Sequence, residues 1–317
     1  MKVRFVVSLS FLLMNLFSGA SVLHAEEMQG QHFSLPSWGE WRDVVVRGQG
    51  RWALDIDNDS LLLKKDDGLY TSGYRLQRSY NLVQNQQQTS YRWYLGQELY
   101  TPSDIKWQAG AIPKYERPYA GWLYLGWQRE HYLATGAAFK FGLELGCMGP
   151  CAAGEWSQTK LHQAIHQPLP RGWSTQVGQT WGAQLNLELA TDRWTPLANL
   201  DVAPTVKLRA GRIFTELGAG LLWRYGDLNA LPDQSARYWF ARTELRLVGR
   251  NATIENSRLD PDLLPKSDVA EAELGYLWQG WDYGLSLAVI RRSSEVQQIP
   301  NSRGAQNFVR MQLQYRH

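Results

Sequence analysis

Alternation of apolar and polar residues is the main pattern along this 317-residue chain. In residues 139–145, phenylalanine or leucine occupies every second position, and lysine, glycine or glutamate occupies the positions between. Residues 184–189, 282–289 and 309–316 repeat the pattern, and no long stretch after residue 25 has the 3.6-residue period of a helix. Because successive side chains of a β-strand point to opposite faces, the pattern predicts strands with one apolar and one polar face.

Two architectures fit such strands. In a soluble sandwich the apolar faces form the core, whereas in an outer-membrane barrel they face lipid and the polar faces line the lumen. Aromatic residues recur at the strand ends, and the chain has 15 Trp and 15 Tyr, which suit a membrane–water interface. Ten to twelve alternating segments can be counted, and single-chain bacterial barrels have even strand numbers. We therefore predict an all-β, transmembrane antiparallel barrel of twelve strands.

The first 25 residues have the features of a secretory signal peptide. Lys2 and Arg4 precede an apolar run at residues 5–17, and small residues lead to a cleavage point after Ala25. The apolar run is too short to span a bilayer as a helix. We predict a signal peptide at 1–25 and one barrel domain at 26–317, whose first part precedes the first strand. The expected location is the outer membrane of a Gram-negative bacterium.

The charge and the cysteine content bear on three possibilities: nucleic-acid binding, a disulfide and a metal site. The formal net charge is +3 and no stripe of lysine and arginine appears, which argues against a nucleic-acid partner. Cys147 and Cys151 could close a small disulfide loop in an oxidising compartment. A single pair with this spacing, without a cluster of His and Cys around it, is weak evidence for a metal.

The first candidate site lies where two predicted strands meet. Asn58 and Asp59 end one strand, and Thr71 lies early in the next. By alternation Thr71 shares the lumen face with Arg75, whereas Tyr70 shares the other face with Ser72 and Leu76. Pairing of the two strands would bring the oxygen-bearing side chains to one rim, where they suit calcium, and calcium can polarise an ester carbonyl. The alternative is a hairpin turn, for which Asn, Asp and Gly are common residues.

The second candidate site is a predicted short helix over residues 156–166 at the rim of the barrel. It contains His162 and His166, which are four residues apart and could share one helix face. No third metal ligand is near them in sequence, so a neutral imidazole acting as a general base is the better chemical interpretation. The alternative is that both histidines belong to an exposed loop.

Several motifs in order resemble the outer-membrane lipid A deacylase family, the lipid A 3′-O-deacylases. The resemblance covers most of the chain after residue 25 and rests on DNDSLLLKKDDGLYTSGYRL, QELYTPSDI, ERPYAGWLYLG, GPCAAGEWSQTKLHQAIHQPLPRGWSTQ, GRNATIENSRLDPD and RRSSEVQQ. It implies a twelve-stranded barrel and a calcium-dependent esterase that removes the 3′-linked acyloxyacyl chain of lipid A. It also implies a lipopolysaccharide partner and a monomer or homodimer.

Carried onto this chain, the resemblance makes Asn58, Asp59, Thr71 and His162 the catalytic residues, with Asn58 and Asp59 as calcium ligands. We expect His162 to activate water, with calcium and the Thr71 hydroxyl stabilising the oxyanion. A Thr71 nucleophile activated by His162 is the second route. The family's glutamate after the histidine is missing, because no acidic residue lies between Glu155 and Glu188. Glu155 or a distant acid would have to orient His162.

Two other functions are compatible with a barrel. An outer-membrane phospholipase A-like esterase needs a serine nucleophile, for which Ser60 and Ser72 are candidates. A non-catalytic porin-like barrel needs only charged residues in its lumen. Lys64, Lys65, Lys114 and Arg117 either contact lipid A phosphates or are solvated loop charges.

Overall fold

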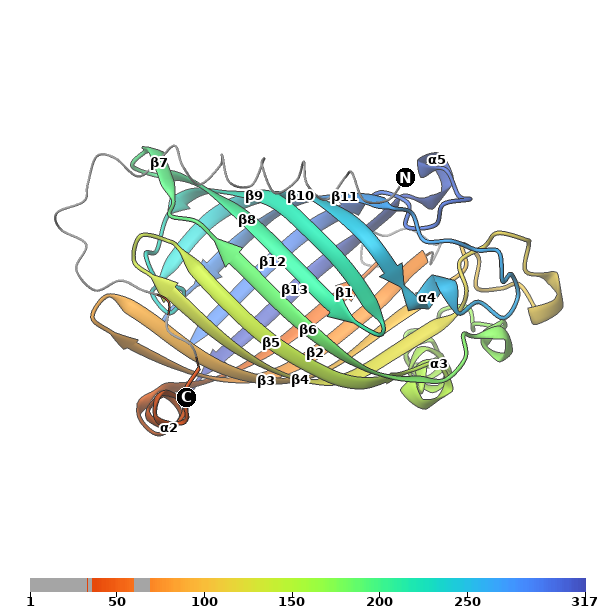
Figure 1. The fold of residues 1–317 in the computed structure, drawn as a ribbon, viewed down its shortest axis with the longest axis horizontal. Coiled ribbons are helices and arrows are strands. Elements are labelled where there is room, and N and C mark those ends of the chain that lie inside the picture. The colour runs from red at the N-terminus through yellow and green to blue at the C-terminus, as the bar shows by residue number, and fades with distance from the viewer. Residues whose placement is uncertain (1–32, 34–35, 60–68) are drawn as a thin grey trace, which may run out of the picture. The chain divides into compact units, whose positions relative to one another are not determined.

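Antiparallel strands close into a barrel (Figure 1). The computed structural model describes residues 33, 36–59 and 69–317, and the barrel belongs to the compact unit Pro36–His317. The predicted signal peptide, residues 1–25, lies outside the described residues. The strands of the ring, each paired with its neighbours, are β1 Gln49–Asn58, β2 Leu69–Gln84, β3 Gln87–Thr101, β4 Ala120–Leu133, β5 Ala138–Met148, β6 Thr180–Ala190, β8 Leu200–Gly211, β9 Phe214–Asp227, β10 Ala236–Asn251, β11 Asp268–Gln279, β12 Tyr283–Arg292 and β13 Gln306–Arg316.

Two pairings complete the ring, one between the first and last strands and one that passes over the short β7. β1 pairs with β13, and β6 pairs with β8, because the short β7 (Trp194–Leu197) adds to β8 beside the ring. The predicted twelve-stranded antiparallel barrel is confirmed, with β7 as one extra strand. β1 begins at Gln49, so the segment before it is the extension that the sequence indicated.

Helices lie in the connections and before the first strand (Figure 1). They are α2 Trp38–Arg47, α3 Gly154–Ala164, α4 Ala252–Glu255, α5 Asn301–Gly304, and the 3-10 turns η2 Ala109–Ala111, η3 Pro150–Ala152 and η4 Trp173–Thr175. In the described part of the chain, no helix has the length and hydrophobicity needed to cross a membrane.

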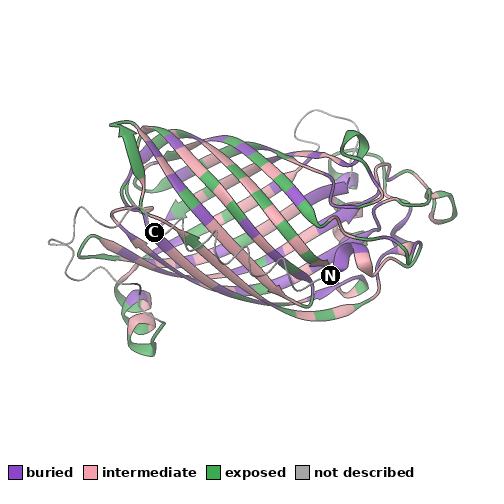
Figure 2. Cartoon of the chain, turned by 45° about the horizontal axis from the view of Figure 1, so that its top comes forward, coloured by how far each residue is buried: buried purple, intermediate pink, exposed green. Residues whose placement is uncertain are grey.

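The strands carry their apolar side chains on the outer wall. Leu95, Leu125 and Leu145 are 53%, 61% and 67% exposed to solvent, although each is in mid-strand. Figure 2 shows the resulting alternation of exposed and buried positions along the strands. Residues next to these leucines in the same strands, such as Tyr94 and Glu144, point the other way and line a cavity in the lumen. An outer wall of this kind fits hydrocarbon rather than water.

The connections at the two ends of the barrel differ in length. At the end that holds the C-terminus, residues 85–86 join β2 to β3, and residues 280–282 join β11 to β12. At the other end, residues 212–213 form one short turn, but the connections at residues 102–119, 149–179, 252–267 and 293–305 are long. Bacterial barrels have short periplasmic turns and longer extracellular loops, so the end with the long connections is extracellular.

The connection at residues 228–235 folds across the periplasmic mouth. It joins β9 to β10, but its Asp233 forms ion pairs with Arg51 of β1 and, at 3.2 Å, with Arg316 of β13. The N–H of Asp233 donates to Gln88 Oε1 of β3 at 2.9 Å. Because β3 lies on the opposite side of the ring from β9 and β10, this connection crosses the lumen. We call residues 228–235 the periplasmic plug.

Candidate active site on the outer wall of the barrel

The residues predicted to act near the β1–β2 connection lie at the extracellular end. Asp57 lines the lumen cavity, so Asn58, the next residue of β1, lies on the outer wall. Asn58 pairs with Ser72 of β2, and the N–H of Asp59 donates to the carbonyl oxygen of Thr71 at 3.4 Å. Backbone pairing therefore holds Asn58, Asp59 and Thr71 together, and Asp59 is buried there.

Thr71 is the extra residue of a β-bulge. The register between β2 and β3 shifts between Tyr70 and Ser72, and a bulge turns the side chains before it relative to those after it. The Tyr70 hydroxyl reaches into the lumen and donates to Asp57 Oδ2 at 3.1 Å. The prediction that Tyr70 shares a face with Ser72 was wrong, because alternation with a period of two does not continue through a bulge.

The bulge also places the Thr71 hydroxyl away from the lumen. Its Oγ1 lies 2.7 Å from Thr101 Oγ1. Glu98 and Tyr100 line the lumen cavity, so Thr101 lies on the outer wall, and the predicted lumen position of Thr71 was wrong as well. Because Thr101 donates to the Pro102 carbonyl at 3.2 Å, Thr71 is the donor to Thr101. The oxygen lone pairs of Thr71 then remain able to bind a cation.

Helix α3 packs against the same wall (Figure 1). Gln97 Nε2 of β3 donates to the carbonyl of Ala152, just before the helix, at 2.6 Å. A Cβ added at Gly154, the first residue of α3, would lie 2.5 Å from Trp173 and 3.0 Å from Leu99. Only glycine allows the helix to begin so close to the barrel.

The buried face of α3 carries His162. This side chain is 5% exposed, and its Nδ1 lies 2.6 Å from the carbonyl oxygen of Pro168. A carbonyl oxygen only accepts hydrogen bonds, so Nδ1 carries the proton in the neutral ring and Nε2 carries a lone pair. A histidine in this tautomer can take a proton from water at Nε2.

The same helix face carries Gln158, one turn before His162. Gln158 is 1% exposed, and Trp173 Nε1 donates to its Oε1 at 2.7 Å. Because an indole N–H only donates, this bond fixes the amide orientation, and Nε2 has no hydrogen-bond partner among the described residues. A buried, unpartnered N–H₂ group near a base is a candidate donor to an oxyanion. The spacing of four residues from His162 was the signal in the sequence, but it did not reveal this role.

Two other residues of this segment lie apart from the buried face. Glu155, the nearest acidic candidate to orient His162, is exposed in the first turn of α3. The main-chain carbonyl of Pro168, rather than Glu155, occupies Nδ1 of His162. His166 is exposed beyond the end of the helix and has a positive φ of 57°.

Among the cations expected near lipid A phosphates, Arg117 is neither a surface group nor a solvated one. It is 0% exposed and forms an ion pair with Glu295 at 2.9 Å. Lys114 is exposed, with its Nζ over the ring of Tyr115. Lys64 and Lys65 lie outside the described residues, as does the candidate nucleophile Ser60.

Comparison with known proteins identifies the family. The family model of outer membrane protein LpxR matches residues 11–317. The chain belongs to the LpxR family. The solved structure of LpxR from Salmonella typhimurium is similar to it, with 19% identity and a TM-score of 0.69, over 84% of this chain and 99% of that chain. The β domain of the Bordetella autotransporter BrkA has 14% identity and a TM-score of 0.49, over 84% and 99%. No individually curated protein matches the sequence.

Membership of the LpxR family confirms the resemblance that the motifs indicated and the location in the outer membrane. The Salmonella structure supports the barrel fold of this LpxR-family protein. Since the outer wall of an outer-membrane barrel faces lipid, the candidate site lies on the bilayer side of the barrel wall rather than in the lumen.

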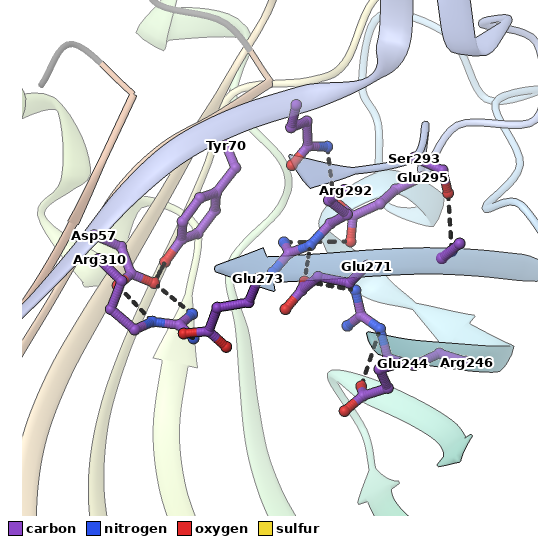
Figure 3. Close-up of polar contacts among 12 residues, drawn as sticks. Asp57, Tyr70, Glu244, Arg246, Glu271, Glu273, Arg292, Ser293, Glu295 and Arg310 are labelled. Carbon is purple, nitrogen blue, oxygen red and sulfur yellow. Dashed lines mark hydrogen bonds and ion pairs between the residues drawn. The ribbon is translucent and has the colours of Figure 1, made fainter. Parts of the chain in front are cut away.

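The lumen of this LpxR-family barrel is filled with paired charges. Figure 3 shows Arg310 bound to Asp57, with Nε to Oδ1 at 2.9 Å and Nη2 to Oδ2 at 3.0 Å. Farther along, Glu271 pairs with Arg292 at 2.7 Å and with Arg246 at 3.5 Å. The remaining cavity, of about 500 Å³, is lined by such groups. These ion pairs stabilise the interior behind the site.

The cysteines of this LpxR-family chain lie beside the site. Cys147, in β5, and Cys151, in η3, are joined by a disulfide with a Cα–Cα distance of 6.0 Å. The disulfide ties the end of β5 to the turn from which α3 begins. It therefore helps to hold α3 against the outer wall.

The donor chemistry around Asn58 and Asp59 fits calcium. Calcium takes carboxylate, amide and hydroxyl or carbonyl oxygens, and Asp59, Asn58 and Thr71 offer these groups at the end of one strand pair. In the described ranges 36–59 and 69–317, no three His, Cys, Asp or Glu side chains gather as a metal site.

Proposed function

We propose that this LpxR-family protein is a lipid A deacylase, an outer-membrane esterase that hydrolyses the 3′-linked acyloxyacyl chain of lipid A. The observation that carries the proposal is the hydrogen bond between His162 Nδ1 and the Pro168 carbonyl. It assigns the proton to Nδ1, so Nε2 carries the lone pair that a general base needs, and α3 packs against the outer wall, the side from which a membrane lipid would approach. Membership of the LpxR family supports the same activity.

In this proposal Asn58 and Asp59 hold calcium, and the lone pairs of Thr71 contribute to the same oxygen-rich group. Calcium, when bound, draws electron density from the ester carbonyl. The β1–β2 pairing and the bulge keep the backbone of these residues close together, which supports a shared site for the cation.

Residues of the protein then transfer the proton of the attacking water and stabilise the negative charge of the oxyanion. Nε2 of His162 takes a proton from a water molecule, whose oxygen attacks the ester carbonyl carbon. Gln158 Nε2 donates to the resulting oxyanion, since this group is buried and held in orientation by Trp173. When the tetrahedral intermediate collapses, the carbon–oxygen ester bond breaks and His162 returns the proton to the leaving sugar oxygen. The products are the released acyloxyacyl carboxylic acid and a free 3′-hydroxyl on lipid A.

Two observations weigh on the alternatives. The Thr71 hydroxyl is 2% exposed and donates to Thr101, which favours a binding role over that of a nucleophile. The periplasmic plug crosses the lumen, which disfavours a porin. A phospholipase-like esterase could use the same His162 chemistry, so the substrate has to be tested directly.

The test is mass spectrometry of lipid A from cells that express the protein in a bacterial outer membrane. The wild type should lose the mass of one acyloxyacyl group, and His162→Ala should leave lipid A intact. His166→Ala is the matched control, because His166 lies four residues away and is exposed. A calcium-chelated sample, with calcium restored in a second aliquot, tests the cation.

Folding of each variant is checked by the heat-dependent shift in electrophoretic mobility that intact barrels show. Unchanged lipid A with a folded wild-type barrel would contradict lipid A as the substrate. In that case fatty acid release from phospholipids, lost in His162→Ala, would favour the phospholipase-like alternative. Deacylation by a folded His162→Ala variant would contradict the assigned base.

A further inference from the structure

The outer wall carries polar side chains near its periplasmic end, where a lipid-facing surface should be apolar. Gln128 and Glu130 of β4 face the lumen, so Arg129 and His131 lie on the outer wall. Tyr91 of β3 lies on the same face, next to them. Arg129 and Tyr91 are nevertheless 0% exposed. A charge on the lipid-facing wall of a barrel is destabilising unless something covers and pairs it.

Helix α2 provides that cover. Both oxygens of Glu40 bind Arg129, with Nε to Oε1 at 2.6 Å and Nη2 to Oε2 at 2.7 Å. The Tyr91 hydroxyl donates to Glu40 Oε1 at 2.6 Å. One turn later Val44 is 1% exposed. Figure 1 shows α2 outside the ring, at the end that holds the C-terminus, and the helix contacts β2 and β3 there. A ten-residue helix is too short to be stable alone in water, so these contacts hold it in place.

The aromatic residues of α2 contact aromatic residues of the outer wall, so that together they form one row of rings. Trp38 stacks on Trp41 with ring centroids 4.5 Å apart, and Trp41 meets the edge of Trp93 of β3 at 6.5 Å. Trp93 in turn contacts Tyr80 of β2 at 6.2 Å. Trp93 and Tyr80 alternate with lumen residues, so they belong to the outer wall. Such aromatic rings mark the membrane–water interface of barrels.

In the part of the chain that the structure describes, the face of α2 that turns away from Glu40 and Val44 is exposed to solvent. Trp38, Arg42 and Val46, each four residues apart, share this face. Trp38 and Val46 are both 74% exposed. An exposed face that combines an indole, an aliphatic group and a guanidinium is typical of helices that lie in a lipid headgroup layer.

We propose that α2 is an interfacial helix that binds the phospholipid headgroup layer of the periplasmic leaflet. Trp38 and Val46 enter the boundary between headgroups and acyl chains, and Arg42 contacts the phosphates. Continuity with the aromatic residues of the outer wall favours lipid over a protein partner as the occupant. By anchoring the periplasmic end, α2 fixes the depth of the barrel in the bilayer. This role is independent of the proposed enzymatic function.

The test places an environment-sensitive fluorophore, NBD, at Val46→Cys of the full chain in nanodiscs of phosphatidylethanolamine and phosphatidylglycerol. Both native cysteines are held in a disulfide, so the new thiol is the labelling site. Quenching is measured with a spin label carried on lipid headgroups and with iodide in solution. Arg42→Cys is a second probe on the same face, and exposed Asp192→Cys, in the β6–β7 connection, is the control.

The probes at Val46 and Arg42 should emit at shorter wavelength than the probe at Asp192 and lose fluorescence to the lipid-borne quencher but not to iodide. The probe at Asp192 should show the opposite behaviour. Quenching of both α2 probes by iodide alone, in a barrel that retains its heat-dependent mobility, would overturn the proposal. Protection from both quenchers in a particle with the mass of a dimer would also overturn it, because a second copy would then cover α2.

Discussion

The carbonyl oxygen of Pro168 accepts a hydrogen bond from Nδ1 of His162 at 2.6 Å. The bond joins the end of helix α3 to the segment that follows it. It supplies the orientation that an acidic partner was expected to give, and it needs no charged side chain. A carbonyl fixes the tautomer, but it stabilises a transient imidazolium less than a carboxylate would.

The first prediction concerns this pair of residues. His162→Ala should lower the rate of ester release by about 10²- to 10⁴-fold, because the general base is lost. Pro168→Ala keeps the main-chain carbonyl and should lower the rate by less than about tenfold, as expected for looser positioning of the base. The measurement is the initial rate of acyl release from purified lipid A in detergent micelles. An equal loss in both variants would mean that Pro168 acts through its ring rather than its carbonyl.

The second prediction concerns the oxyanion donor. Gln158→Leu removes the unpartnered Nε2 and should lower kcat by about 10²-fold with little change in KM, because the bond forms only in the transition state. Trp173→Phe keeps the amide but removes the indole N–H that orients it, so its effect should be smaller. A change in KM without a change in kcat would indicate that Gln158 binds the ground state of the substrate instead.

The barrel could be predicted from the sequence because apolar outer-wall residues alternate with polar lumen residues along each strand. Leu95, Leu125 and Leu145 occupy the lipid face simply because hydrocarbon surrounds it. The short β7 was not predicted, because it pairs through a few residues with one neighbour. A helix was predicted over residues 156–166 from a short local pattern, and the structure places α3 two residues earlier, at Gly154–Ala164, so His166 lies beyond its end.

The residues of the candidate site could be named from the sequence, but the direction and contacts of their side chains could not. The bulge at Thr71 turns it from the lumen to the outer wall, and a single extra residue leaves no mark in a period of two. The orientation of Gln158 depends on Trp173, and the burial of Arg117 depends on Glu295 far along the chain. The first contact forms within the folded 149–179 connection, and the second forms only when two loops distant in sequence meet at the extracellular end.

The third prediction concerns acid stability at the extracellular end. Burial alone would raise the pKa of Glu295, but the guanidinium groups of Arg117 and Arg292 outweigh it and lower the pKa to about 2. A lowered folded-state pKa gives stability that is present above the ordinary value of 4.5 and is lost as the pH falls toward about 2. The loss should reach about 3 kcal/mol in this window.

Urea unfolding of the barrel in detergent, followed between pH 7 and pH 2, measures this effect. Glu295→Gln should remove this part of the pH dependence. It should also destabilise the barrel at neutral pH by about 3–5 kcal/mol, because Arg117 stays buried without its carboxylate. A variant with the wild-type slope below pH 4.5 would show that other carboxylates cause the acid effect.

The fourth prediction concerns the periplasmic plug. Asp233→Ala removes the carboxylate that binds the plug to Arg51 of β1 and Arg316 of β13, so the plug loses both ion pairs and should no longer stay across the mouth. Ion current through planar bilayers should rise above the wild-type level, with a preference for anions because the exposed arginines line the opening. Asp227→Ala, which breaks an exposed ion pair with Arg237 in the same hairpin, should leave the current unchanged.

The Asp233→Ala variant also tests whether lipid A deacylation depends on closure of the lumen. The candidate site lies on the outer wall at the extracellular end, whereas Asp233 lies at the periplasmic mouth, so opening the plug should not change lipid A deacylation. A wild-type barrel that already conducts as well as Asp233→Ala would contradict closure by the plug and favour a porin-like function. If Asp233→Ala abolished deacylation while the barrel stayed folded, the lumen would have to take part in the reaction, and the outer-wall site would be incomplete.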